Sequence, residues 1–374
     1  MPWPKPEITL INPPLKPKRL VWIAVFAVLL IITGTLLILM WSDNRYFSAV
    51  SFWVMLILVP AVIGSIALSL RFYQYGIAQE RFEIWQQEQA RIEDNWQDWA
   101  MRSVRVMGSY WITPNELTAA SIIFDLKNLP VQIEKVLAFE NDEQDDEPYF
   151  EDLFYSMAQS INQLPNCQKI AITVYSSPES YAYLDDTIAV VSRRCQIKPR
   201  YTFKQQISQH VALNDIIQLI DNPSDEPHLL IMNNLRSHGS AFLGAILIVD
   251  EQLLDPDLSQ MVESHLLRPM VTDDITDGIH QMVEMQPALS GVTQLWCANL
   301  DKEHEIEIAK QLAEHNISPK AIHFLDSIAG QQTDLAHWSL LALGNQLVKQ
   351  TNESLLLASK SNGQFLFSVL TKKV

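Results

Sequence analysis

Glycine is scarce in this chain, at 11 of 374 residues, whereas an average soluble protein has about 7%. Neither the glycine-rich phosphate loop of nucleotide hydrolases nor the G-x-G-x-x-G pattern of dinucleotide-binding proteins is present. A nucleotide or dinucleotide held by such a loop is therefore excluded, and we expect no bound cofactor.

Cysteine is also rare, with only Cys167, Cys195 and Cys297. Their number is odd and they lack metal-ligand spacing, which favours reduced thiols in a cytoplasmic setting. Cys297 falls in an apolar run and is expected to be buried. His304 stands among three glutamates, but this segment is typical of a solvated helix start. We therefore expect no metal site.

Basic side chains are few outside the N-terminal region. The net charge is −16, and residues 1–71 contain six bases and two acids. The remainder therefore carries −20. Such a surface repels phosphate backbones, which argues against nucleic-acid binding, and it could steer a basic protein partner.

Two long hydrophobic runs without charge cover residues 20–41 and 47–70. Each is long enough to cross a hydrocarbon core of about 30 Å as a helix. A cleaved signal peptide is disfavoured for the first run, because it is too long and a second run follows at once. The sequence therefore predicts a membrane hairpin with a very short connector.

The orientation follows from basic residues near the ends of the two runs. Lys16, Lys18 and Arg19 precede the hairpin, Arg71 follows it, and the connector holds only Arg45. We expect both termini and the main domain on the cytoplasmic side of a bacterial inner membrane. The predicted division is a proline-rich tail at 1–19, spans at 20–41 and 47–70, a juxtamembrane helix at 71–107 and a cytoplasmic domain at 108–374.

Residues 71–106 predict a polar helix that continues out of the membrane. Phe82, Trp85, Trp96 and Trp99 recur along it at spacings typical of one helix face. Two interpretations stay open: the aromatic residues pack on the following domain, or Trp85, Trp96 and Trp99 bind a partner.

The rest of the chain alternates short β-rich runs with amphipathic helices, which predicts a layered α/β fold. A loop after one strand groups Arg236, Ser237 and His238 and could bind an anion, although no G-x-S-x-G elbow is present. The predicted strands are 169–177, 197–203, 228–234, 244–251, 292–300, 354–359 and 365–371, and the predicted helices are 150–164, 208–221, 304–315 and 338–350.

The order of these elements carries a family resemblance. The helix "ALNDIIQLI" at 212–220 precedes a strand and a chain-reversing strand pair, and "DSIAGQQTDLAHWSLLALG" at 326–344 is a loop that enters an apolar helix. From residue 150 onward, the chain resembles the C-terminal half of a β-ketoacyl synthase of the thiolase-like superfamily. The resemblance implies a thiolase-like layered α/β domain behind the two membrane helices, and it allows a homodimer.

The resemblance also implies where catalytic residues would stand. Condensing enzymes need a cysteine thiolate at a helix N-terminus and two polar groups, usually His–His or His–Asn. The nucleophile's place lies near Gln206 and has no cysteine; nearby Ser208 is expected to be a helix cap. Asn299 stands in the H-G-T place, and Asp326 and Gln331 stand at the K and H of K-S-x-x-G-H. We therefore expect these catalytic positions to be lost and the chain not to be an enzyme.

Two functional hypotheses follow. The first is a non-catalytic membrane scaffold, whose organisation resembles that of accessory proteins of bacterial type VI secretion, including lipase-effector adaptors. Its partner would be a basic effector or a component of the secretion apparatus. The alternative is a membrane-bound enzyme or sensor of acyl or lipid metabolism, with an atypical site around Ser237 and His238 or around Cys297.

Overall fold

The computed structural model describes most of the chain, in two compact units. The helical unit is Lys5–Asn95, and the α/β unit is Met1–Pro4 with Trp96–Val374. Cys167, Ser208 and Ser237 fall outside the described residues. The described ranges are 3–4, 11–41, 49–140, 146–164, 169–176, 184–207, 213–236, 238–250 and 259–372.

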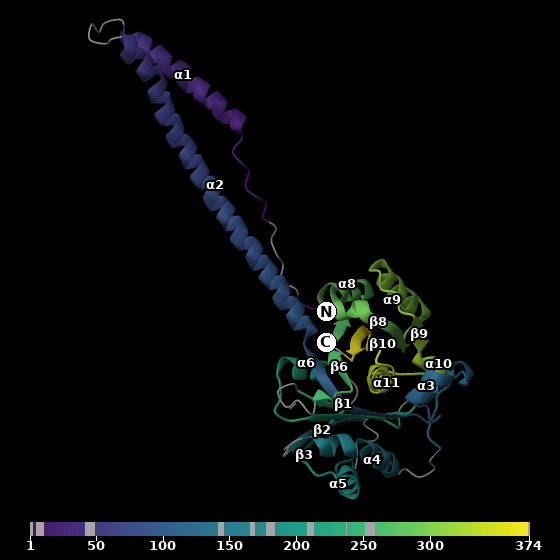
Figure 1. The fold of residues 1–374 in the computed structure, drawn as a ribbon. Coiled ribbons are helices and arrows are strands. Elements are labelled where there is room, and N and C mark those ends of the chain that lie inside the picture. The colour runs from purple at the N-terminus through teal and green to yellow at the C-terminus, as the bar shows by residue number, and fades with distance from the viewer. Residues whose placement is uncertain are drawn as a thin grey trace. The chain divides into compact units, whose positions relative to one another are not determined.

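The helical unit contains α1 (Arg19–Trp41) and the first part of α2 (Ala49–Met101) (Figure 1). Both helices are long and apolar enough to cross a membrane. They approach one another at glycines: a Cβ atom on Gly34 would lie 3.3 Å from Leu56 Cδ1, and one on Gly64 would lie 3.4 Å from Phe26 Cδ2. Small residues at such contacts let helix backbones come close in a lipid environment.

The polar continuation of α2 ends at Met101, and β1 (Ser103–Ile112) begins two residues later. The sequence analysis extended this helix through residue 106. Val104 and Val106 instead alternate with polar neighbours and are buried in the sheet, which is the period of a strand. The division of the chain into domains at residues 107 and 108 stays a prediction.

Eleven strands of the described α/β unit form one sheet, in the order β3-β2-β4-β5-β1-β6-β11-β10-β8-β9, with β7 also paired to β11. The strands after β1 are β2 (Lys169–Ser176), β3 (Arg200–Ile207), β4 (His228–Asn234), β5 (Phe242–Val249), β6 (Ser264–Leu267), β7 (Met270–Thr272), β8 (Val292–Ala298), β9 (Ala321–Phe324), β10 (Ser354–Ser361) and β11 (Gln364–Thr371).

The strand order is an internal repeat. From its outer edge to the centre of the sheet, the first half has the order β3-β2-β4-β5-β1. Read from the opposite edge to the centre, the second half has the matching order β9-β8-β10-β11-β6. The three outer strands of each half are parallel to one another: β3, β2 and β4 in the first, and β9, β8 and β10 in the second. The fourth strand of each half, β5 or β11, is antiparallel to both of its neighbours. The antiparallel pair β1–β6 joins the halves.

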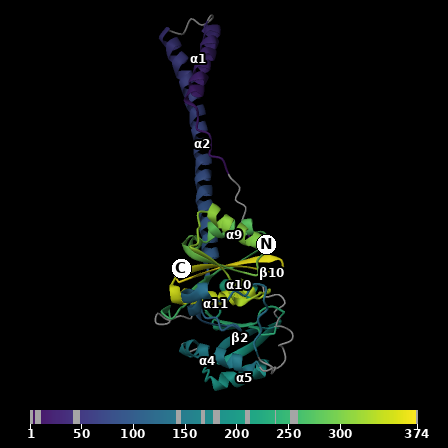
Figure 2. The same cartoon turned by 90° about the vertical axis from the view of Figure 1, so that its right-hand side faces the viewer.

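Three hydrophobic clusters correspond to three helical layers. In Figure 1, α8 and α9 lie on one side, α11 lies in the middle and α4 and α5 lie on the other side; Figure 2 shows the same order after a quarter turn. The helices are α3 (Ala119–Asp125), α4 (Glu147–Gln163), α5 (Leu184–Arg194), α6 (Asn214–Asp221), α8 (Ile275–Met285), α9 (Lys302–Glu314), α10 (Leu325–Ala329) and α11 (Ala336–Thr351).

The central helix α11 is apolar nearly all round, as expected for a helix between two sheet faces. Its polar side chains have partners: Ser339 accepts a hydrogen bond of 2.7 Å from Trp111 Nε1, and the ring nitrogens of His337 lie 2.8 Å from the hydroxyls of Ser359 and Ser368. Burial lowers the pKa of His337 to about 3, so this imidazole is neutral in the fold.

Arg268 joins three elements at the start of the α/β unit. Its side chain is 1% exposed and forms a two-pronged ion pair with Asp221, the last residue of α6. Its Nε donates to the carbonyl of Trp99 at 3.1 Å, and the guanidinium carbon lies 3.8 Å from the Trp99 ring centroid. Gln286 on the other side donates to the carbonyl of Arg268 at 2.9 Å. The end of α2 is thus attached to α6 through one buried cation.

Replacing this cation tests the junction. Arg268→Met leaves the Asp221 carboxylate without its paired cation and removes one of the two donors to the Trp99 carbonyl. We therefore expect the free energy of unfolding to fall by about 2–4 kcal/mol. Arg194→Met is the matched control, because Arg194 pairs with Glu147 at the surface and its loss costs at most about 1 kcal/mol. Urea unfolding followed by near-ultraviolet circular dichroism measures both; equal losses would contradict the assignment.

His337 predicts a pH dependence of stability. The pKa of His337 is lowered in the folded state. Below a pH of about 6.5 the unfolded chain therefore binds a proton at this residue, whereas the folded chain does not. The free energy of unfolding thus decreases as the pH falls from about 6.5 toward 3. Between pH 7 and 5 this loss is about 2 kcal/mol. His337→Gln keeps a donor and an acceptor and should remove that part of the loss. An unchanged pH slope in the variant would show that another group is responsible.

Candidate functional site

A cavity of about 550 Å³ lies between α6 and one face of β2, β3 and β4. Lys204 and Gln206 of β3, Tyr175 of β2 and Asp215 of α6 contribute polar atoms to its wall, and Leu219 of α6 is part of its apolar lining. The cavity therefore combines hydrogen-bonding groups with an apolar surface, as small-molecule sites do.

The strand register explains why these side chains share a face. Tyr175 is paired with Gln206, and Thr173 is paired with Lys204, across β2 and β3. Alternate residues of a strand point to the same side of the sheet, so Thr202 joins Lys204 and Gln206. Because β3 is the last strand on this side of the sheet, a polar row there remains accessible.

Tyr175 anchors the wall of the cavity. Its hydroxyl donates to the carboxylate of Asp215, and its ring stacks on Trp338 of α11 with centroids 5.3 Å apart. Burial, then the hydrogen bond and charge of Asp215, raises the pKa of Tyr175 far above its ordinary value. The phenol therefore stays protonated and serves as a donor.

Two donors in the cavity are available to a ligand. Among the described residues, the exposed ammonium of Lys204 forms no ion pair, and the half-buried amide of Gln206 forms no hydrogen bond. His228 lies deeper, and burial lowers its pKa, against a smaller opposing effect of Glu226. Its buried Nε2 has no partner in the described structure.

The other expected catalytic positions come together at a different loop pair. Asp326 accepts backbone N–H groups from Asn299 at 2.9 Å and from Gln332 at 3.0 Å. Asn299 has a left-handed φ of 53° and donates its side-chain amide to the Lys360 carbonyl. The structure therefore brings Asn299 and Asp326 together as a cross-link between the ends of β8 and β10 and the loop after α10.

Gln331 belongs to the same loop, and its side chain is exposed. Its backbone N–H donates to the Lys135 carbonyl, and its carbonyl accepts from Ser240, both at 2.8 Å. Burial raises the pKa of Asp326 in spite of its hydrogen bonds. Burial also raises the pKa of Cys297 strongly, so that thiol is not an activated nucleophile.

In the loop with Arg236 and His238, the arginine is already paired with an acid, and anion binding there stays a prediction. Arg236 pairs with Asp146 at 2.9 Å, immediately before α4. His238 is exposed, and the intervening Ser237 falls outside the described residues.

The three tryptophans of the juxtamembrane helix differ in their surroundings. Trp96 and Trp99 pack on the hydrophobic cluster beneath α8, with ring centroids 4.7 Å apart, and Trp3 meets Trp99 edge to face at 5.8 Å. This arrangement matches the packing interpretation for these two residues. Trp85 lies in the helical unit and is half-buried there.

Tyr175, Lys204, Asp215 and His228 line the cavity and are not among the residues expected from the sequence. The signal that could have found part of this set is the polar alternation of Thr202, Lys204 and Gln206 in a strand that otherwise carries aromatic residues. The pairing of Asp215 with Tyr175, 40 residues away, has no sequence signal.

Comparisons with known proteins bear on the fold. No protein-family model matches the chain, and no curated protein matches its sequence. A type II PKS acyl-carrier protein in complex with its ketosynthase bound to the hexaketide, AntDE:AntF, matches with a TM-score of 0.51 at 11% identity, over 73% of this chain and 100% of that chain.

Two further structures match with lower TM-scores. The 3-oxoacyl-[acyl-carrier-protein] synthase III of Aquifex aeolicus VF5 gives 0.45 at 12% identity, over 72% of this chain and 99% of its own. Cerulenin-bound OleA of Xanthomonas campestris gives 0.47 at 10% identity, over 74% and 98%. We base the fold assignment on the ketosynthase.

This comparison corrects one expectation. The prediction that the chain is not an enzyme is wrong, because the ketosynthase that shares its architecture is a condensing enzyme. Altered side chains near Gln206, Asn299, Asp326 and Gln331 do not by themselves show that activity is lost. The α/β unit has the thiolase-like fold of condensing enzymes, and it follows two helices that are long and apolar enough to span a membrane.

Proposed function

We propose that this protein is a membrane-anchored enzyme of acyl-chain metabolism, and that the cavity beside Gln206 is its acyl site. The single observation that carries the proposal is the 550 Å³ cavity, in which the unpaired donors Lys204 and Gln206 stand near the apolar Leu219 and Leu230. An acyl thioester or a fatty acid has this combination of a polar carbonyl end and an apolar chain.

The polar wall suits acyl transfer. Ammonium and amide donors stabilise the negative charge that develops on a carbonyl oxygen during attack at its carbon. The Tyr175 phenol donates its one proton to Asp215, so it shapes this wall and is not a further donor to the carbonyl. Cys297 is buried with a raised pKa, so the reaction that the described residues support best is transfer of the acyl group to water or a small acceptor.

Anchoring places this cavity near a source of acyl chains. We propose that residues 20–41 and 47–70 span a bacterial inner membrane, with both termini and the α/β unit in the cytoplasm. The basic residues that flank the spans support this orientation. A homodimer stays a prediction; the outer edge of β3, the terminal strand of the described sheet, is where a second copy could pair.

Lys204 gives the first test of the acyl site. In the full-length protein in detergent, Lys204→Gln should weaken the binding of a long-chain acyl-coenzyme A by about tenfold, the usual effect of losing a hydrogen bond to a charged group. Release of free thiol should fall with it. Displacement of a fluorescent fatty acid measures binding, and a thiol reagent measures turnover.

Two further variants make this test decisive. Lys198→Gln removes the same charge from an exposed position outside the cavity and should change neither readout. Leu219→Trp fills the apolar part and should abolish binding. If Leu219→Trp binds the acyl ligand as well as the unchanged protein does, the cavity is not the acyl site.

Recognition of a basic protein partner is the second candidate, as for a type VI secretion effector or apparatus component. The observation that favours it is the net charge of −20 on residues 72–374. A partner steered by this charge should be recovered from host lysate at low salt and released as salt rises to about 0.5 M, where charges are strongly screened. Recovery that does not depend on salt, or recovery of non-basic proteins alone, would contradict this role.

A further inference from the structure

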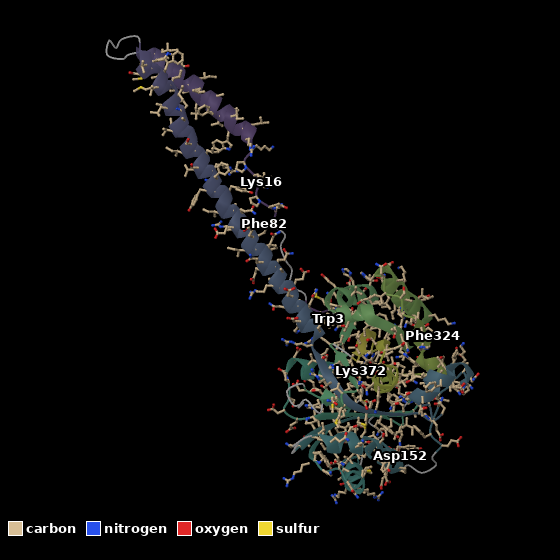
Figure 3. All side chains as sticks on the ribbon, viewed as in Figure 1. Trp3, Lys16, Phe82, Asp152, Phe324 and Lys372 are labelled. Carbon is tan, nitrogen blue, oxygen red and sulfur yellow. The ribbon has the colours of Figure 1, made fainter. Side chains whose placement is uncertain are left out.

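A second cavity, of about 430 Å³, lies within the helical unit, where the N-terminal segment runs beside α2. Ile11, Asn12 and Pro14 form one side, and residues of α2 from Gln74 to Phe82 form the other. Figure 3 shows Lys16 and Phe82 on these two neighbouring segments. Most of the lining is aliphatic or aromatic, and Arg81 is its one charged residue.

The charge toward the membrane-spanning side of this cavity is mostly basic, although Glu80 and Glu83 flank Arg81. Within the described residues 11–41 and 49–82, Glu80 is the one acid. Arg81 is exposed and forms no ion pair with a described residue. The bases in the same ranges are Lys16, Lys18, Arg19, Arg71 and Arg81.

The lining of the cavity on α2 begins close to the end of the second apolar run. Arg71 is the first charge after the second apolar run, and Phe72, Tyr73 and Tyr75 follow it, as aromatic residues do at a membrane surface. Gln74 is about 5 Å beyond Arg71 along the helix, and Arg81 is about 15 Å beyond it. Side chains of a helix lean toward its N-terminus, which in α2 is the membrane side, so the guanidinium of Arg81 reaches back toward the headgroups.

We propose that this cavity binds an anionic phospholipid, with the phosphate of the headgroup at Arg81 and the glycerol backbone against the apolar lining. The neighbouring bases add attraction, since each base near an anionic surface strengthens binding several-fold. The occupant is a membrane lipid rather than a free phosphate ester, because the lining around Ile77 and Phe82 is apolar and continues from the membrane-spanning part of α2. This proposal does not depend on the acyl site.

Native mass spectrometry of the full-length protein in a mild detergent tests the proposal. With added phosphatidylglycerol we expect about one strongly retained lipid, and with phosphatidylcholine none. Arg81→Gln should reduce retention about five- to tenfold. Ala78→Leu narrows the cavity without changing charge and should reduce retention as well.

Arg91→Gln is the matched control, because Arg91 lies ten residues farther along α2 and already pairs with Glu88. It should retain phosphatidylglycerol as the unchanged protein does. Equal losses in Arg81→Gln and Arg91→Gln, or equal retention of phosphatidylcholine, would overturn the proposal. Displacement of the lipid by millimolar glycerol phosphate would overturn it too, because the site would then recognise a free phosphate ester.

Discussion

The buried guanidinium of Arg268 is the contact on which the arrangement of the α/β unit depends. It binds Asp221 at the end of α6 and Trp99 at the end of α2. A buried arginine is stable only while its partners stay in place, since an unpaired buried charge is costly. Because α6 forms one wall of the cavity beside Gln206, the position of that wall is tied to the residues where the long helix ends.

The central helix α11 imposes a second constraint, because both halves of the sheet pack on it. Trp338 stacks on Tyr175 from the first half, while His337 lies between Ser359 and Ser368 of the second half. One turn of helix therefore holds the two repeats in a fixed relation. The neutral state of His337 is a consequence of complete burial there, and it couples the stability of the fold to pH.

Some of this architecture follows directly from sequence. The strand at 228–234 and the apolar helix near 338–350 were predicted within two residues, because each is a dense apolar run. β1 was hidden because "SVRV" follows a long helical pattern without a glycine or proline to end it. The family resemblance singled out Gln206 only as a lost catalytic position. Its neighbours at the cavity, Lys204, Tyr175 and Asp215, meet only through strand register and tertiary packing.

The polar residues around Asp326 differ physically from those at the cavity. Both carboxylate oxygens of Asp326 accept backbone N–H groups, so that loop pair is committed to holding the ends of strands together. Lys204 and Gln206 have donors without described partners at the wall of an open cavity. A ligand gains most from donors that the protein has not already satisfied, since it need not compete with an internal bond. In the proposed function, this is the reason why an acyl carbonyl would be recognised at the edge of the first half-sheet, beside α6.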